Sequence, residues 1–344
     1  MKKHDDKTLR IKRKHLIWLQ ESRGLSPSSV DKAAASIDRF TSWLGNRALK
    51  AFHIDWARGF KQHLDKATNP KTGKALSAVT VAHTLRNVKG FFGWLADQPG
   101  YKSRIRHTEV EYFNPPKRTA KRARGTTWQP HASPEQLRHV LTLMPTSNVL
   151  ERRDRAVVAF LFLTGCRDGA AATIRLANVD LNAGCVHFKG PEIETKFGKV
   201  FTTWFLPVGG PVRQVLEDWV RELRHEHLWG PDDPLFPRTK VGLGPGQRFQ
   251  PLGLDRAPWS NGTRICNIYR NAFVSAGLPG FHAHSIRHTL TELGSQLCGT
   301  IEEMKAWSQN VGHEDVMTTL RSYGTVASGR QAELLRRMRK DKDA

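Results

Sequence analysis

Residues 282–323 read HAHSIRHTLTELGSQLCGTIEEMKAWSQNVGHEDVMTTLRSY. His284 and Arg287 lie three positions apart, so a helix that begins here presents both side chains on one face. His313 and Tyr323 follow in the next segment, where they can converge on the same point. A histidine, an arginine, a second histidine and a tyrosine in this order form a set of side chains that suits a phosphodiester substrate.

A second arginine, far upstream, completes this set. Residues 151–164 are predicted to form a helix that is apolar from Val157 onward and leads into Thr164-Gly165-Cys166-Arg167. Gly165 is well placed to adopt the left-handed conformation that ends many helices. Such a turn would direct Arg167 out of the core. We therefore expect two guanidinium groups, Arg167 and Arg287, at one site.

The composition predicts a polyanionic partner. The chain has 344 residues, of which 39% are hydrophobic and 25% charged, and it is long enough for two domains and at least one sizeable core. Its 54 Lys and Arg against 32 Asp and Glu give a formal net charge of +22 and a pI near 10.3. Because the cations are spread over several separate segments, nucleic acid is the simplest expected partner.

Cysteine usage and hydropathy indicate the cytoplasm. The four cysteines show no CxxC spacing and lie in apolar or helical contexts. They are therefore expected to be small core residues in a reducing compartment, with no disulfide framework and no zinc site. The sequence shows no signal peptide and no apolar run long enough for a membrane span. We expect a cytoplasmic protein with no membrane partner.

Residues 1–113 are predicted to form a helical domain. Helices are expected over 8–22, from Pro27 to Gly45, over 54–66 and from Ser77 to Leu95, each with an apolar face. The polar faces carry cations that would lie against a DNA backbone, and the candidate contacts are Lys61, Arg86 and Lys89.

Residues 114–130 are predicted to be a basic linker. Two prolines, Pro115 and Pro116, precede a run of cations with no acid among them, which favours an extended connector. The linker is either a plain flexible connection or one that also follows phosphates along a duplex. Its candidate DNA contacts are Lys117, Arg118, Lys121, Arg122 and Arg124.

Residues 131–344 are predicted to form a second domain, which makes the chain mainly α-helical with a small antiparallel β-sheet. A capping box with proline at the first helical position opens it at Ser133. Strands are expected over 184–194 and 200–208, with a turn between them, and residues 230–260 are expected to be irregular because they are rich in Gly and Pro. The remaining helices are expected over 211–226, 261–276, 284–297 and 301–309, with a basic tail helix from about 328.

If the substrate is a DNA phosphodiester and no metal takes part, each residue of this set can be given a role. In-line attack on a phosphodiester places charge on the non-bridging oxygens, and fixed guanidinium groups can stabilise that charge. His284 and His313 can donate to the same oxygens or move a proton near neutral pH. Tyr323 is the candidate nucleophile, because its hydroxyl can form a covalent link to phosphorus. A lysine on the β-turn would protonate the leaving 5′ oxygen. Lys196 is the first candidate, ahead of Lys189 and Lys199.

These motifs resemble the tyrosine recombinase (phage integrase) family of site-specific DNA recombinases. The resemblance lies in Thr164-Gly165-Cys166-Arg167, the hairpin lysine, the run from His284 to Thr289, Gly312-His313, Thr318-Thr319 and Tyr323. Residues 25–30 and 91–95 are similar to the family's helical core-binding domain. The resemblance implies a C-terminal α+β catalytic domain of the DNA breaking-rejoining type.

The same resemblance implies a mechanism and an assembly. Tyr323 would form a 3′-phosphotyrosine and release a 5′-hydroxyl that attacks a partner strand, so neither metal nor ATP is needed. Strand exchange would be performed by a tetramer on DNA in the service of DNA integration or a mobile genetic element. Accessory DNA-bending proteins are a further implied partner.

The chain departs from the family pattern at three points. The family often has an acid three residues after the first arginine; here that position is Ala170, and the acid is Asp168. Tyr323 follows His313 by ten residues, one more than is usual. The long hairpin leaves the catalytic lysine open between Lys196 and Lys189.

Three other functions compete with site-specific recombination. A type IB topoisomerase-like enzyme would use the same chemistry to relax DNA, and a non-catalytic regulator would only bind it. A zinc enzyme would use His282, His284 and His288, but no glutamate follows the first histidine as a metalloprotease requires.

Overall fold

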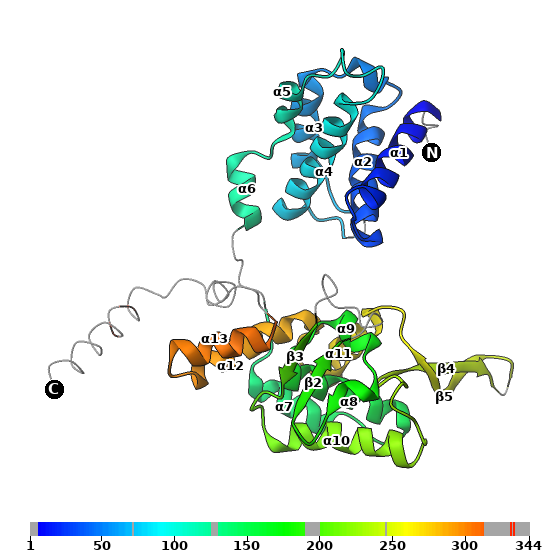
Figure 1. Cartoon of the computed structure of the whole chain (residues 1–344), viewed down its shortest axis with the longest axis vertical. Coiled ribbons are helices and arrows are strands. Elements are labelled where there is room, and N and C mark those ends of the chain that lie inside the picture. Colours follow the sequence, from blue (N-terminus) through cyan, green and yellow to red (C-terminus); the bar gives the residue numbers. More distant parts are fainter. Residues whose placement is uncertain are drawn as a thin grey trace. The chain divides into compact units, whose positions relative to one another are not determined.

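The structure, a computed structural model, describes residues 6–70, 72–124, 130–189, 200–244 and 246–312, together with residues 331 and 333. The chain divides into two compact units, Met1–Gly125 and Thr126–Ala344. The described part of the first unit is mainly helical, with an isolated antiparallel bridge between Thr68 and Ala75, and the second unit combines helices with two small antiparallel sheets (Figure 1). The mainly α-helical fold with a small antiparallel sheet is thereby confirmed.

The first unit is a bundle of amphipathic helices around an aromatic core. The Phe40 ring packs edge-on against Phe60, Phe92 and Phe113, at centroid distances of 5.0, 5.2 and 5.7 Å. Aromatic pairs prefer this arrangement because the positive ring edge meets the negative ring face. The helices and 3-10 turns are α1 (Asp6–Glu21), α2 (Pro27–Leu44), η1 (Leu49–Ala51), α3 (Ile54–Lys66), α4 (Ala78–Ala96), α5 (His107–Val110), η2 (Glu111–Phe113) and α6 (Lys117–Arg124).

Helix α6 corrects the prediction of an extended linker. Lysine, arginine and alanine are good helix formers, and the prolines that suggested an extended chain lie before the helix instead of inside it. The Ala120 amide donates to the Pro116 carbonyl at 2.9 Å, which closes the first turn. The half-buried side chains of Thr119, Ala120 and Ala123 lie on one side, and α6 packs against α4. Packing against α4 therefore stabilises α6 as a helix although its positive charges repel one another.

The second unit is built around helix α8. Its last nine residues, Ala156–Thr164, are all buried, so the helix is surrounded by protein on every side. The capping box predicted at Ser133 is confirmed, because both of its reciprocal hydrogen bonds form with Gln136. The helices and 3-10 turns of this unit are α7 (Pro134–Leu143), α8 (Val149–Thr164), α9 (Asp168–Thr173), η3 (Leu176–Asn178), α10 (Gly210–His225), α11 (Thr263–Ser275), η5 (Ala283–Ser285), α12 (Ile286–Leu297) and α13 (Ile301–Asn310).

Three short strands lie beside this helical core. They are β1 (Val179–Asp180), β2 (Cys185–Phe188) and β3 (Phe201–Trp204), in the order β1-β2-β3 and antiparallel. Val186 pairs with Thr203 in the centre of the β2–β3 hairpin. The predicted hairpin is thus present, although its described strands are shorter than predicted. Its loop, residues 190–199, lies outside the described residues, as does most of the tail helix predicted from about residue 328.

The prediction of an irregular 230–260 segment is wrong. This segment contains a second hairpin, with β4 (Pro237–Leu243) antiparallel to β5 (Phe249–Pro258). Proline removes a backbone donor, but a two-stranded ribbon has free edges where the missing donor costs nothing. The prolines and glycines that suggested irregular chain are therefore compatible with an exposed ribbon.

Candidate active site

The end of α8 places the first predicted arginine. Gly165 caps the helix with φ 60° and ψ 18°, the left-handed conformation predicted from the sequence. A Cβ on Gly165 would also lie only 2.8 Å from Leu290 Cδ1 of α12, so the position is both conformationally and sterically restricted. The chain turns here, and Arg167 becomes the N-cap residue of α9, half-buried at the edge of the core.

Arg287 lies in the first turn of α12 and is almost fully buried. Its side chain is 5% exposed, and its Nη1 donates to the Gly165 carbonyl oxygen at 2.7 Å. Its Nη2 is buried and has no hydrogen-bond partner among the described residues. Burial, reinforced by the nearby charge of Arg167, lowers the pKa of Arg287 to about 10. The guanidinium therefore remains charged at neutral pH, with a donor still unused.

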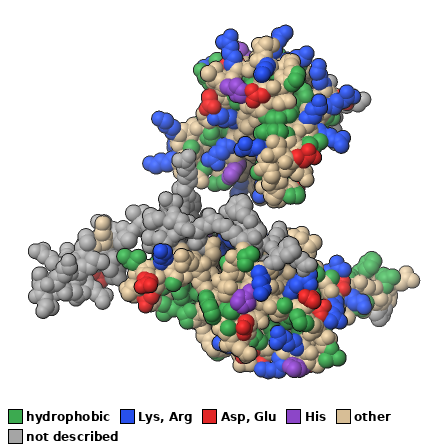
Figure 2. Space-filling model, viewed as in Figure 1, with side chains coloured by type: hydrophobic (Ala, Val, Ile, Leu, Met, Phe, Trp, Pro, Cys, Tyr) green, Lys and Arg blue, Asp and Glu red, His purple; other side chains and the backbone are tan. Residues whose placement is uncertain are grey.

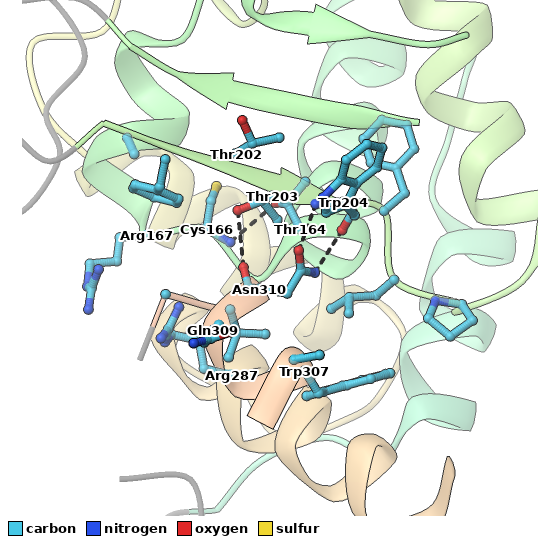
Figure 3. Close-up of a pocket in the computed structure, with 18 of the residues that line it drawn as sticks. Thr164, Cys166, Arg167, Thr202, Thr203, Trp204, Arg287, Trp307, Gln309 and Asn310 are labelled. Carbon is cyan, nitrogen blue, oxygen red and sulfur yellow. Dashed lines mark hydrogen bonds between the residues drawn. The ribbon is translucent and has the colours of Figure 1, made fainter. Parts of the chain in front are cut away.

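Both arginines line one pocket of about 1160 Å³. Figure 3 shows Arg167 and Arg287 at one end of this pocket, close to Cys166, and Trp204 and Trp307 toward the other end. Strand β3 and helix α13 supply the remaining walls. The structure thus brings together the two guanidinium groups that the sequence places 120 positions apart.

His284 belongs to the same electrostatic environment. It lies on η5, exposed at the surface. Its pKa is lowered first by partial desolvation and then by the positive charges of Arg287 and Arg167, while Asp168 acts in the opposite direction. Its ring is therefore mainly neutral at pH 7, with one ring nitrogen that donates a hydrogen bond and one that accepts.

Asp168 is the acid closest in sequence to Arg167, and the structure gives it a definite position. Its Oδ2 accepts a hydrogen bond from Cys266 Sγ of α11 at 3.2 Å. A Cβ on Gly262 would lie 2.6 Å from that same oxygen, so only glycine allows this close approach. Ala170, where the family pattern often has the acid, is 4% exposed and part of the core. The carboxylate at position 168 therefore faces α11 and offsets part of the positive charge around His284.

Asn310 joins the end of α13 to β3, and it was not among the predicted site residues. Its Oδ1 accepts from the Trp204 amide at 2.7 Å, its Nδ2 donates to the Trp204 carbonyl at 2.8 Å, and its own carbonyl accepts from Thr203 Oγ1 at 3.1 Å. Figure 3 shows these three bonds. They fix β3, which leads out of the hairpin loop, against the residue three positions before His313. In the sequence, only its place just before Val311 and Gly312 relates Asn310 to the predicted site.

Several predicted site residues fall outside the described part of the chain. These are Lys196, Lys199, His313 and Tyr323. Lys189 is described and lies exposed just after β2, where its amide donates to the His187 carbonyl at 3.1 Å. The placement of the nucleophile and of the catalytic lysine therefore stays a prediction.

The predicted DNA contacts of the first unit differ in how free their charges are. Arg86 is exposed, whereas Lys89 Nζ donates to Glu111 and Asn114 at 2.8 and 3.0 Å and is thus partly neutralised. Lys61 is half-buried, and desolvation lowers its pKa. On α6 the cations Lys117, Arg118, Lys121 and Arg122 are all exposed, while the side chain of Arg124 lies outside the described residues. Figure 2 shows basic side chains widely spread over both units.

Two of the three histidines of the zinc hypothesis are engaged in other contacts. The His282 Nδ1 accepts from the His284 amide at 3.2 Å, and the His288 ring lies 5.8 Å from the His131 ring. Within the described ranges, no group of three His, Cys, Asp or Glu side chains is arranged to hold a metal ion. The observed environment of His284 is instead one of arginines, which disfavours a cation there.

Comparison with known proteins decides the family. The model of the phage integrase family matches residues 132–330, more than half of the chain. The chain belongs to the phage integrase family. Within it, the protein is a tyrosine-type site-specific recombinase, as the resemblance predicted.

Individual relatives are distant but cover nearly the whole chain. A tyrosine recombinase XerC of Pseudomonas syringae pv. tomato is 23% identical over 308 residues, which cover 89% of this chain and 88% of the relative. A XerC of Xylella fastidiosa (strain M23) is 22% identical over 303 residues, covering 88% and 87%.

Solved structures share the fold. The Tn1549 transposon integrase in complex with a circular intermediate DNA superposes with a TM-score of 0.62 at 14% identity, covering 96% of this chain and 99% of that one. A lambda integrase dimer bound to a COC′ core site gives a TM-score of 0.61 at 11% identity, covering 93% of this chain and 97% of that one.

None of the helices in the described ranges combines the length and the apolar character needed to cross a bilayer.

Proposed function

We propose that this recombinase cuts and rejoins double-stranded DNA through a covalent 3′-phosphotyrosine. The observation that carries the proposal is Arg287, a buried cation beside a second arginine at the same pocket. Among the described residues its guanidinium has one hydrogen-bond partner, and its Nη2 has none. A buried guanidinium without an acid needs an anion, and the non-bridging oxygens of a phosphodiester match its planar fork of donors.

The reaction follows from this arrangement. The Tyr323 hydroxyl passes its proton to the unprotonated ring nitrogen of a neutral histidine, His284 or His313, as its oxygen attacks the scissile phosphorus. The bond from that oxygen to phosphorus forms, and the bond from phosphorus to the 5′ oxygen breaks. Arg167 and Arg287 stabilise the charge on the non-bridging oxygens, with His284 and His313 donating to the same phosphate. The leaving 5′ oxygen takes a proton from the hairpin lysine, Lys196 in our assignment. Rejoining reverses these steps with a 5′-hydroxyl as attacker, so the energy of the bond is kept without ATP or a metal ion.

The proposal extends to the assembly and its setting. The structural neighbours include recombinases in complex with DNA and a dimer on a core site, which supports DNA as partner and oligomers on DNA. We propose a tetramer on paired DNA sites, acting in the cytoplasm on a mobile genetic element. Exchange only between paired sites supports this assembly, whereas relaxation of supercoiled DNA without a specific site would favour a topoisomerase-like function.

Covalent trapping tests the reaction. The protein is incubated with a nicked DNA substrate from which the 5′ product diffuses away, and covalent adducts are resolved on a denaturing gel. We expect an adduct with the unaltered protein and none with Tyr323→Phe. Tyr112→Phe is a matched control, because Tyr112 is an exposed tyrosine of the first unit. An adduct that persists in Tyr323→Phe would overturn the assignment of the nucleophile.

A further inference from the structure

The β4–β5 ribbon extends from the second unit. Figure 1 shows it projecting away from the helices of that unit. At about 3.3 Å per residue, the ten residues of β5 span roughly 30 Å. Register shifts between Pro237 and Arg238 and between Lys240 and Val241 introduce bulges, which strengthen the twist of the ribbon.

The root of the ribbon is firmly attached. The buried Arg153 of α8 donates to the Pro237 carbonyl at 3.1 Å and to Thr239 Oγ1 at 3.0 Å, and its guanidinium lies 5.1 Å from the centre of the Trp259 ring. Across the strands, Arg238 is paired with Asp255 at 2.7 Å. These contacts hold the root in place, so the outer part is presented at a defined angle.

The outer part of the ribbon has one apolar face with no partner in the described structure. Val241 pairs with Pro251 and Leu243 with Phe249, so that these four side chains share a face. The exposed fractions are 58% for Val241, 62% for Leu243 and 79% for Phe249. Exposed apolar side chains gathered in this way usually mark a binding surface.

The charge of the ribbon indicates what the partner is. Residues 237–258 contain four cations, Arg238, Lys240, Arg248 and Arg256, and one acid, Asp255, which gives a net charge of +3. Lys240 and Arg248 are exposed and form no ion pair with any described residue, whereas Arg238 and Arg256 are paired with Asp255 and Asp233. Lys240 and Arg248 directly precede Val241 and Phe249, so they lie on the opposite face of the ribbon. The outer ribbon therefore presents unpaired positive charge on one face and apolar side chains on the other, and Figure 2 shows both kinds of side chain there.

We propose that the β4–β5 ribbon is a second DNA-binding element, which lies in a major groove of the duplex away from the scissile phosphate. The major groove admits a two-stranded β-ribbon. In that position Leu243 and Phe249 face thymine methyl groups, and the long side chains of Lys240 and Arg248 extend past the edges of the ribbon to the phosphates that border the groove. This inference rests on the proposed action on DNA and adds a contact that the arginine pocket does not provide.

Salt-dependent binding tests the ribbon. The probe is a mixed-sequence duplex of about 60 base pairs, titrated with the full chain between about 50 and 200 mM salt. We expect the variant with both Lys240→Gln and Arg248→Gln to lose about two from the slope of log affinity against log salt, and to bind about tenfold more weakly at low salt. The control carries Arg221→Gln and Arg224→Gln, two exposed cations of α10, and should keep the slope.

The apolar face is tested with Leu243→Ser combined with Phe249→Ser. We expect weaker binding to duplexes rich in A·T pairs than the unaltered protein shows, with an unchanged oligomeric state in sedimentation without DNA. If the charge variant keeps the full slope while the apolar variant changes self-association, the ribbon contacts protein and the proposal is wrong. If the unaltered protein binds no DNA at all, the proposed function itself fails, and that outcome is distinct from loss confined to ribbon variants.

Discussion

Two buried arginines in the second unit have opposite surroundings. Arg153, at the root of the ribbon, is fully buried, forms two hydrogen bonds with Asp154 at 2.9 and 2.7 Å, and lies over Trp259. Arg287, in the first turn of α12, has one bond to a carbonyl, a donor with no partner among the described residues, and a second cation nearby. The Arg153 guanidinium is thus paired within the protein, whereas we propose that the Arg287 guanidinium is available to a ligand. Incomplete satisfaction of a buried cation, more than burial itself, distinguishes the functional arginine.

The largest expected effect concerns Arg153. Arg153→Gln leaves the partly buried Asp154 without its main partner, so we expect the free energy of unfolding to fall by about 3 to 5 kcal/mol. Denaturant unfolding of the second unit, followed by tryptophan fluorescence, measures the loss. Arg213→Gln is the control, because Arg213 pairs with Glu217 on the surface, where such pairs contribute at most about 1 kcal/mol. If Arg153→Gln lowered the free energy of unfolding no more than the control did, Arg153 would not differ from Arg287 in its contribution to stability.

The next effect concerns Arg287, where stability and activity should separate. Because its guanidinium is only partly satisfied in the folded protein, Arg287→Gln should change the free energy of unfolding by less than about 1 kcal/mol. The rate of covalent adduct formation should fall by about 100- to 1,000-fold, since a fixed donor to the transition-state charge is lost. Unfolding and adduct assays on the same preparation check both values. A large loss of stability with activity in proportion would make Arg287 a structural residue like Arg153.

His15 in the first unit resembles Arg287 in one respect: its buried Nδ1 also has no hydrogen-bond partner among the described residues. The ring lies among Trp18, Phe91 and Trp94, and burial lowers its pKa from 6.5 to about 4. This histidine stays neutral and needs no anion, so we assign it to the core. An unused polar atom thus indicates a ligand site only when its group is charged.

The pH dependence of stability tests that assignment. The unfolded chain takes up a proton at His15 near pH 6.5, whereas the folded ring resists protonation down to about pH 4. Stability around α1 and α4 should therefore be constant with respect to this group above pH 6.5 and fall by roughly 3 kcal/mol between pH 6.5 and 4. Hydrogen exchange of the full chain measures this loss. His15→Phe should remove that part of the pH dependence; an unchanged dependence would contradict the assignment.

The smallest expected effect concerns Asp168. Its carboxylate raises the pKa of His284 against desolvation and two arginines, so Asp168→Asn should lower the pKa of His284 further. The acidic limb of adduct formation should then move to lower pH, while the rate at its optimum changes little. Asp232→Asn, an exposed acid elsewhere in the unit, is the control. If the acidic limb moved to higher pH, or moved equally in the control, Asp168 would not be what raises the pKa of His284.

The parts of this fold that could be predicted depend on local rules. The capping box at Ser133 and the left-handed cap at Gly165 were predictable, because each depends on a few neighbouring residues whose chemistry allows one geometry. Helix α6 and the β4–β5 ribbon were missed, because their formation depends on packing against α4 and on an anchor from Arg153. Tertiary contacts overrode local preference in both cases.

Residue type and order identified candidate site residues, but not the hydrogen bonds that hold the described ones in place. Arg167, His284 and Arg287 were identified from residue type and order, and the structure places the two arginines at one pocket. The bond from Arg287 to the Gly165 carbonyl joins residues 122 positions apart, and that from Trp204 to Asn310 joins residues 106 apart. Such bonds follow from the packing of α12 and α13 and have no local signature.

We propose that Arg287 balances the negative charge of the scissile phosphate. The direct test compares adduct formation on a normal substrate with that on a substrate whose scissile phosphate is replaced by an uncharged methylphosphonate. We expect Arg287→Gln to slow the reaction by about 100-fold or more on the charged phosphate and by much less on the neutral one. An equal loss on both substrates would contradict it.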